Sequence, residues 1–258
     1  MILKFDLKMR ALKDVRTIHM YLPDDYLTSG KTYPVLYMFD GQNLFNDEDA
    51  SFGMSWRLAD TIRECDFELI IVGQECSHRG NDRLMEYSPY PFYDIEFGGW
   101  FEGYGNETMD FFIHDLKPYI DSHFPTKKDR DHTWICGSSC GGEMALYAGI
   151  KYPEVYSKTA ALSPYLIPTA DEFIEEVENA GDLSKSSFYI SWGAMEGNTM
   201  HAFIPETKIV TEIGNRLSWK KAQVFYNVKE YGSHTEFDWG EEAPLFLDYF
   251  TDEQENAD

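Results

Sequence analysis

The sequence has few basic side chains and no long uncharged apolar run. Lys and Arg together number 22 against 45 Asp and Glu, which gives a formal net charge of −23. This surplus of negative charge repels phosphate groups, so we expect neither nucleic acid nor an anionic membrane as a partner. No segment reaches the roughly 18 apolar residues that a membrane-spanning helix needs. The opening segment MILKFDLKMRALKDVRTIH lacks the apolar core of a signal peptide. We therefore expect a cytoplasmic location, although a secreted protein without its leader would look the same.

Cysteine and histidine occur without the spacing of a disulfide or metal framework. The four cysteines form no CxxC pair, so we expect them to be reduced and mostly buried. The seven histidines form no HExxH motif and no cluster with cysteine. We therefore expect no metal site.

The chain also lacks internal repeats and any Pro/Gly/Ser-rich linker. Its 258 residues, 43% of them hydrophobic and 16% aromatic, are enough for one sizeable core. We expect a single domain over residues 1–258, with a polar tail that frays.

Short apolar runs alternate with longer amphipathic segments. The runs RTIHMYL, PVLYMF, ELIIVG, HTWICG, KTAALS, SFYISWG and AQVFYNV are typical of strands. Helical periodicity follows several of them, in NETMDFFIHDLKPYIDSHF, GGEMALYAGIKY, ADEFIEEVENA and PETKIVTEIGNRLSW. This alternation predicts the α/β class, with a mostly parallel central sheet and helices on both faces.

The segment HTWICGSSCGGEM contains a G-x-S-x-G motif, from Gly137 to Gly141. A strand is predicted before it and a helix after it, which is the context in which Ser139 would be a nucleophile and Ser138 a filler residue. The helix N-terminus would offer backbone N–H groups to a developing oxyanion. A plain glycine-rich turn is the alternative. A phosphate-binding loop is disfavoured because no Lys-Ser/Thr follows the glycines.

A serine hydroxyl needs a base to remove its proton, and in this type of enzyme the order is serine, acid, histidine. Only His201 and His234 follow Ser139. His234 lies in a glycine-containing loop after a predicted strand, so it is our first choice for the base. His201 is the second.

The acid should follow the strand between the nucleophile and the histidine. Glu196 occupies that place, after SFYISWG. Asp171, Glu172 and Asp182 precede the strand and are interpreted as surface carboxylates. Asp238 follows the histidine and would break the order.

An oxyanion hole needs two donors. The residue after the nucleophile, Cys140, supplies one backbone N–H, and the loop DGQN after the strand PVLYMF supplies the other. Gly41 would allow a close backbone approach there, and Gln42 is the predicted second donor.

The stretch YSPYPFYDIEFGGWFEGY, residues 87–104, is crowded with aromatics and fits neither period. Aromatic faces stack on sugar rings and phenolic groups, so Trp100, Tyr90 and Phe92 are candidate substrate contacts. The same residues would also suit a core. The sequence leaves open whether this segment is a lid or part of the core.

Taken in order, these motifs resemble the putative-esterase family of α/β-hydrolases, which includes feruloyl and acetyl-xylan esterases, enterochelin-type esterases and S-formylglutathione hydrolase (esterase D). The resemblance runs from RTIHMYLPDDY through YPVLYMFDGQNLF, NDRLMEYSPY and GSSCGGEMALYAGIKYPEVY to GSHTEFDW. Cys140 is a departure, because the family often has methionine there. That position acts through its backbone, so we expect activity to survive the change.

The resemblance implies a serine carboxylic-ester hydrolase that works through an acyl-enzyme and needs no cofactor. It favours acylated carbohydrate or hydroxycinnamate esters, so the expected partner is a small-molecule or oligosaccharide ester. A siderophore-lactone esterase and an S-acylglutathione thioesterase remain alternatives with the same triad, and an inactive binding module is a remote one. The acyl group, the alcohol and the oligomeric state, including a homo-oligomer, stay open.

Overall fold

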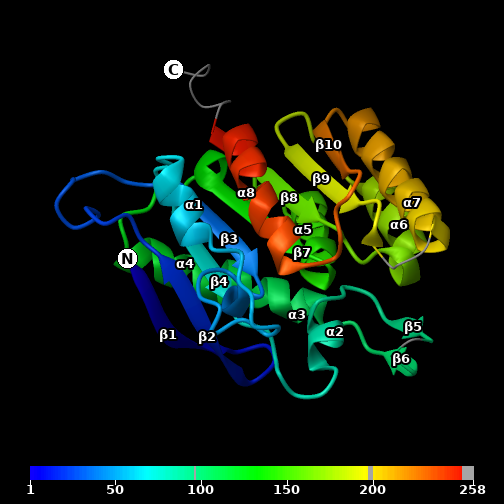
Figure 1. Cartoon of the computed structure of the whole chain (residues 1–258), viewed down its shortest axis with the longest axis horizontal. Coiled ribbons are helices and arrows are strands. Elements are labelled where there is room, and N and C mark those ends of the chain that lie inside the picture. The colour runs from blue at the N-terminus through cyan, green and yellow to red at the C-terminus, as the bar shows by residue number, and fades with distance from the viewer. Residues whose placement is uncertain (96, 197–199, 252–258) are drawn as a thin grey trace.

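The structure is a computed structural model that describes residues 1–95, 97–196 and 200–251, without the side chains of 200–204. One eight-stranded sheet runs through the molecule in the order β1-β2-β4-β3-β7-β8-β9-β10 (Figure 1). β1 pairs antiparallel with β2, and β2 pairs antiparallel with β4. The remaining neighbours in this sheet, β4-β3-β7-β8-β9-β10, pair parallel. Their bounds are β1 Ile2–Met9, β2 Asp14–Tyr21, β3 Val35–Phe39, β4 Ile70–Gln74, β7 Thr133–Ser138, β8 Lys158–Leu162, β9 Ser187–Gly193 and β10 Gln223–Lys229.

Helices cover both faces of the sheet, as the sequence predicts. α1 and α8 lie on the face toward the viewer in Figure 1, and α3, α4, α5, α6 and α7 pack on the other face. The bounds are α1 Leu58–Glu64, α2 Asp82–Glu86, α3 Gly105–Asp110, α4 Lys117–His123, α5 Cys140–Lys151, α6 Ala170–Asn179, α7 Met200–Trp219 and α8 Glu236–Thr251. The predicted helix over residues 106–124 is continuous but contains a π turn, Phe111–Leu116, between α3 and α4.

The side-chain alternation of β3 shows why both faces are covered. Val35, Tyr37 and Phe39 belong to the core under α4 and α5, whereas Leu36 and Met38 belong to the core under α1 and α8. Every residue of this strand is buried, which explains why its sequence, VLYMF, is continuously apolar and does not alternate with polar residues. The central strands are therefore fixed from both sides.

A second, two-stranded sheet is formed by β5 Phe92–Asp94 and β6 Gly99–Phe101. This hairpin lies within the aromatic stretch 87–104 and projects from the main body at lower right in Figure 1. The sequence left open whether this stretch is a lid or part of the core, and it did not predict the hairpin, because strands of three residues are too short to show a period.

Candidate active site

Ser139 sits in a tight turn between the buried strand β7 and helix α5. Its φ of 57° and ψ of −126° lie outside the regions that a non-glycine residue normally adopts. A Cβ on Gly137 would come within 2.2 Å of the Gly141 carbonyl oxygen, so only glycine fits before the turn. This strand–turn–helix geometry projects the Ser139 hydroxyl beyond the carboxyl edge of the sheet.

His234 links Ser139 to Glu196. The Ser139 Oγ lies 2.9 Å from Nε2 of His234, and Nδ1 of the same ring lies 2.9 Å from Oε2 of Glu196. With its Nδ1 proton donated to the carboxylate, the imidazole presents an Nε2 lone pair to the serine hydroxyl. The three side chains thus form one hydrogen-bond chain from three separate loops at the sheet edge.

Glu196 is held by the loops around it and is only 3% exposed. Its Oε1 accepts the Ser163 hydroxyl at 2.6 Å and the backbone N–H of Gly193 at 2.5 Å. Trp239 in turn donates its indole N–H to Ser163 at 2.9 Å and packs edge-on against the His234 ring. These contacts fix the carboxylate and the imidazole in one orientation.

The other candidate acids lie elsewhere. Asp171 and Glu172 are exposed on α6. Asp182 pairs with Lys221 at 2.5 Å on the surface. Asp238 accepts the Thr235 hydroxyl at 2.8 Å, which ties together the loop that carries His234. The side chain of His201, our second choice for the base, lies outside the described residues.

Two backbone amides near Ser139 are candidate oxyanion donors. Cys140 is the first residue of α5, and the first N–H groups of a helix have no intrahelical acceptor. The 3₁₀ turn Gly41–Asn43 is closed by a 2.9 Å bond from the Asn43 N–H to the Asp40 carbonyl. The Gln42 amide is not used by that bond, and Gln42 lines the same cavity as Ser139.

The cysteine beside the nucleophile is not a competing one. Burial raises the pKa of the Cys140 thiol to about 11, so the thiol stays protonated near neutral pH. Burial also raises the pKa of Cys76, a second thiol in the cavity wall.

The cavity in front of Ser139 has a volume of about 670 Å³. Most of its lining residues are polar, and the lining includes the rings of Phe52, Phe97 and Trp239. It is lined by Asp40, Gln42, Asn43, Ser51, Phe52, Cys76, Ser77, His78, Gly80, Arg83, Phe97, Ser138, Ser139, His234, Thr235, Glu236 and Trp239. Phe52 and Phe97 are 81% and 50% exposed, so both rings are available at the cavity mouth.

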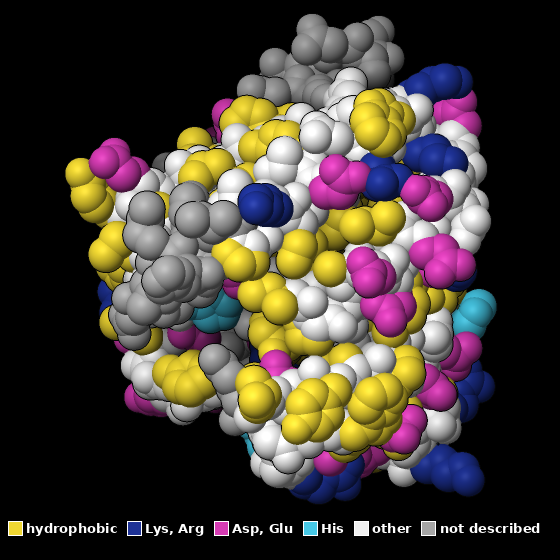
Figure 2. Space-filling model, turned by 90° about the vertical axis from the view of Figure 1, so that its right-hand side faces the viewer, with side chains coloured by type: hydrophobic (Ala, Val, Ile, Leu, Met, Phe, Trp, Pro, Cys, Tyr) yellow, Lys and Arg dark blue, Asp and Glu magenta, His cyan; other side chains and the backbone are white. Residues whose placement is uncertain are grey.

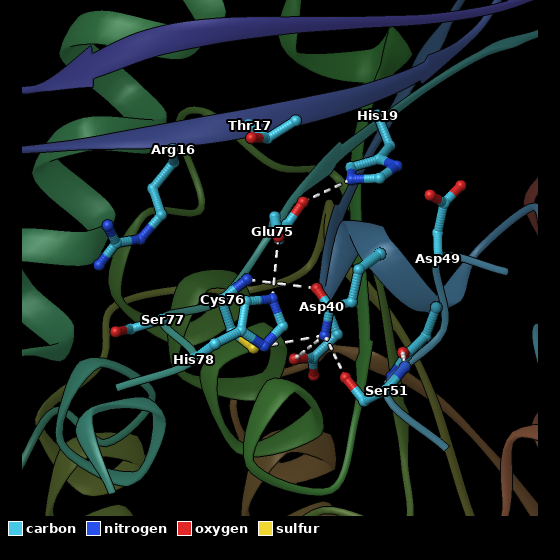
Figure 3. Close-up of polar contacts among 12 residues, drawn as sticks. Arg16, Thr17, His19, Asp40, Asp49, Ser51, Glu75, Cys76, Ser77 and His78 are labelled. Atoms are coloured by element: carbon cyan, nitrogen blue, oxygen red, sulfur yellow. Dashed lines mark hydrogen bonds and ion pairs between the residues drawn. The ribbon is translucent and has the colours of Figure 1, made fainter. Parts of the chain in front are cut away.

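Carboxylates hold the side chains of His78 and Arg83, which both line the cavity. Nε2 of His78 lies 2.8 Å from Glu75, whose other oxygen lies 2.7 Å from the buried His19 (Figure 3). The Arg83 guanidinium is held by Asp40. Sequence spacing carries no sign of the Glu75–His19 and Arg83–Asp40 pairs, because their members come from distant parts of the chain.

The aromatic segment divides into core residues and exposed ones. Phe92 is 4% exposed and stacks on Phe101, with ring centroids 5.2 Å apart. Tyr90 packs edge-on against Tyr147 and Phe173. Both differ from the expectation that they contact substrate, because their rings pack against other aromatic side chains and neither residue lines the cavity. Trp100 is 62% exposed but is also not among the lining residues.

Figure 2 looks onto the face that carries the hairpin. Hydrophobic side chains form a row across its lower part, and a histidine side chain is visible in the hollow above that row. The exposed aromatic and aliphatic side chains of the aromatic segment, residues 87–104, are Tyr93, Ile95, Phe97, Trp100 and Tyr104. Part of the segment thus covers the core and part borders the cavity.

Within the described residues, no group of three or more His, Cys, Asp or Glu side chains is arranged to hold a metal ion. The same part of the chain contains no helix that is long and apolar enough to cross a membrane.

Comparison with known proteins places the chain in a family. The family described as "Putative esterase" matches residues 10–244. The chain belongs to this family of esterases, which are serine hydrolases with the α/β-hydrolase fold.

Individual relatives are distant. "Esterase Rv1288" of Mycobacterium tuberculosis is 31% identical over 157 residues, which cover 59% of this chain and 29% of that protein. "Uncharacterized protein YbbA" of Bacillus subtilis is 27% identical over 157 residues, covering 57% of this chain and 56% of its own. The match thus spans little more than half of one relative and less than a third of the other.

Solved structures share the fold across the whole chain. An IroE-like serine hydrolase from Shewanella oneidensis has a TM-score of 0.77 at 19% identity, covering 98% of this chain and 81% of that one. A ferulic acid esterase has a TM-score of 0.74 at 18% identity and covers 98% of both chains. The enterobactin esterase FES from Shigella flexneri has a TM-score of 0.76 at 15% identity, covering 98% of this chain and 59% of that one. The TM-scores show that the fold is shared, whereas identities this low leave the substrate open.

Proposed function

We propose that the chain is one hydrolase domain, residues 1–258, which cleaves carboxylic esters with Ser139 as nucleophile. The observation that carries this proposal is the unbroken hydrogen-bond chain from Ser139 through His234 to Glu196. A serine, an imidazole and a buried carboxylate in this order make up the machinery of acyl transfer.

In the first step, His234 takes the proton from the Ser139 hydroxyl as its oxygen attacks the ester carbonyl. The carbonyl oxygen becomes negative, and the amides of Cys140 and Gln42 donate hydrogen bonds to it. The C–O bond to the alcohol then breaks, and His234 returns the proton to the leaving oxygen. An acyl group remains on Ser139.

In the second step, water loses a proton to His234 and attacks the acyl carbon. The acid leaves, and the proton returns to Ser139. Glu196 stays ionised and stabilises the imidazolium that forms in each step. Every proton in the cycle is moved by His234, so these residues account for the whole reaction.

We further propose an acylated carbohydrate or a hydroxycinnamate ester as substrate. The cavity supports this choice because the rings of Phe52 and Phe97 can stack on a phenolic or sugar ring. The same cavity is lined by Gln42, Ser51 and His78, whose polar side chains could bind substrate hydroxyl groups. Trp100, outside the cavity on the same hairpin, would contact the more distant part of a long substrate.

A hydrolysis screen tests the proposal. Its substrates are p-nitrophenyl acetate, longer p-nitrophenyl esters, methyl ferulate, acetylated xylo-oligosaccharides, S-formylglutathione and a trilactone siderophore. We expect turnover of p-nitrophenyl acetate, with methyl ferulate or the acetylated oligosaccharide having the highest kcat/KM. A preference for the trilactone or the thioester would contradict the proposed carbohydrate or hydroxycinnamate ester substrate. If no substrate were turned over, the proposal that the protein is an ester hydrolase would be overturned.

A further inference from the structure

Asp40, directly after β3, has a left-handed backbone conformation that a non-glycine residue seldom adopts. Its φ is 54° and its ψ is 50°. Such a conformation is strained for a residue with a Cβ and persists only where the surroundings enforce it. Asp40 begins the 3₁₀ turn that contains the Gln42 amide. The direction of that amide therefore depends on what holds Asp40.

The carboxylate of Asp40 is clamped by Arg83 from α2. Nε of Arg83 donates to Oδ1 at 2.8 Å and Nη2 donates to Oδ2 at 2.7 Å, a two-bond pair that fixes the plane of the carboxylate. Asp40 is 4% exposed. Burial alone would lower the pKa of Arg83, but the charge of Asp40 raises it well above its usual range. Arg83 is thus held as a charged guanidinium beside the Asp40 carboxyl.

The backbone of Asp40 is held by a second residue of the same segment. Its N–H donates to the Tyr87 hydroxyl at 3.1 Å, and that hydroxyl donates to Oε1 of Gln74 at 2.7 Å. Tyr87 is fully buried, and the Arg83 guanidinium lies over its ring, 5.4 Å from the centroid. Arg83 and Tyr87 therefore act on Asp40 as one unit.

The turn itself has little freedom to move. A Cβ on Gly41 would meet the Gly73 carbonyl oxygen at 2.4 Å, so the turn is already pressed against β4. The Gln42 side chain donates to Asp40 and to Ser51, both at 3.3 Å, and its Oε1 accepts the Cys76 N–H at 3.3 Å (Figure 3). Asp40 is the point at which this turn is joined to α2.

We propose that Arg83 and Tyr87 are positioning residues for the oxyanion hole, acting through Asp40 on the Gln42 amide. This inference rests on the proposed function, because it assigns the Gln42 N–H to the transition state. It predicts that loss of the clamp weakens transition-state binding and leaves binding of the intact ester nearly unchanged.

The test compares Arg83→Met with Arg79→Met. Arg79 lies on the same segment and pairs with Asp82 at 3.2 Å, but it is exposed and does not line the cavity. For Arg83→Met we expect kcat on p-nitrophenyl acetate to fall about 10- to 100-fold, less than the 10²–10³ typical of deleting an oxyanion donor. KM should stay within about twofold. The inhibition constant of phenylboronic acid, which forms a tetrahedral adduct with a serine, should rise by a factor similar to the loss in kcat. Arg79→Met should match the wild type.

A double variant separates positioning from direct substrate contact. If Arg83 acts through Asp40, then kcat of the double variant Asp40→Asn/Arg83→Met should fall about as far as kcat of the more impaired single variant. Multiplied losses, or a raised KM with unchanged kcat in Arg83→Met, would overturn the proposal and make Arg83 a substrate ligand.

Tyr87→Phe keeps the test decisive if Arg83→Met fails to fold. It removes only the hydroxyl that holds the Asp40 N–H. We expect a several-fold loss in kcat and a parallel rise in the phenylboronic acid constant at an unchanged far-ultraviolet circular dichroism spectrum. A folded Tyr87→Phe with both constants at the wild-type value would overturn the clamp. In that case, wild-type turnover that still depends on Ser139 would leave the proposed function standing.

Discussion

The Ser139 turn and the β5–β6 hairpin border the same cavity but are held in very different ways. Ser139 follows a strand in the middle of the sheet, and every residue of that strand is buried. The hairpin has strands of three residues and leaves Tyr93, Phe97 and Trp100 at least half exposed. It is attached to the main body by Tyr165, whose ring packs edge-on against Phe92 and whose hydroxyl donates to Asp94. We therefore expect the chemistry to depend on the rigid sheet edge and substrate recognition to depend on the appended hairpin.

The largest expected effect lies at the sheet edge. Ser139→Ala should lower kcat on the order of 10⁶-fold, because the nucleophile is lost. Ser138→Ala, its neighbour in the same cavity wall, should keep most of the activity. Steady-state rates with p-nitrophenyl acetate decide between them. An inactive Ser138→Ala beside an active Ser139→Ala would show that the wrong serine has been assigned.

The acid comes next. Glu196→Gln keeps the shape of the side chain but no longer stabilises the imidazolium, so kcat should fall about 10⁴-fold, less than for Ser139→Ala. Asp238→Asn is the matched control, since that carboxylate only ties together the His234 loop. A near-normal Glu196→Gln with a strongly impaired Asp238→Asn would reassign the acid.

The hairpin should show effects that depend on substrate size. Phe97→Ala removes a ring from the cavity mouth and should lower kcat/KM for methyl ferulate about tenfold, with little change for p-nitrophenyl acetate. Trp100→Ala, outside the cavity, should matter only for an acylated oligosaccharide. Equal losses on all three substrates would show that these rings support the fold rather than the substrate.

The smallest effect concerns stability and pH. Burial, with a further contribution from the charge of Glu196, raises the pKa of Glu206 on α7 to about 7. The native carboxyl therefore keeps its proton between pH 4.5 and 7 while the unfolded one has released it, and the free energy of unfolding falls as pH rises through this range. Glu206→Gln should remove this decline, which we expect to be about 1–2 kcal/mol because the side chain is partly solvent-screened. Urea unfolding of both proteins at pH 4.5, 6 and 8 measures it, and parallel curves would contradict the shift.

The two regions also differ in how far the sequence predicts them. Around Ser139 the local motif predicts the geometry, since a Cβ on Gly137 would collide with the Gly141 backbone and a Cβ on Gly141 would come within 2.9 Å of the Phe39 side chain. The positions of Glu196 and His234 followed from chain order, because the ends of parallel strands meet at one edge. The fold class and the strand–helix alternation were predictable for the same reason.

What could not be predicted depends on distant contacts. Tyr90, Phe92 and Phe97 are all aromatic residues of the segment 87–104, and only packing against distant residues distinguishes the inward-facing rings from the exposed one. The Arg83–Asp40 pair joins residues 43 positions apart on different elements. Phe52 stands in a polar loop, where a lone aromatic gives no sign of the cavity that it borders.

The central claim is that Ser139 is the activated nucleophile, and covalent labelling tests it most directly. The wild-type protein is treated with a fluorophosphonate, which reacts with serines that a neighbouring base activates, and is then examined by intact mass and peptide mapping. The account predicts one adduct, on Ser139, that is absent in Ser139→Ala, strongly slowed in His234→Ala and retained in Ser138→Ala. An adduct on Ser138, or labelling of Ser139 at an unchanged rate without His234, would contradict it.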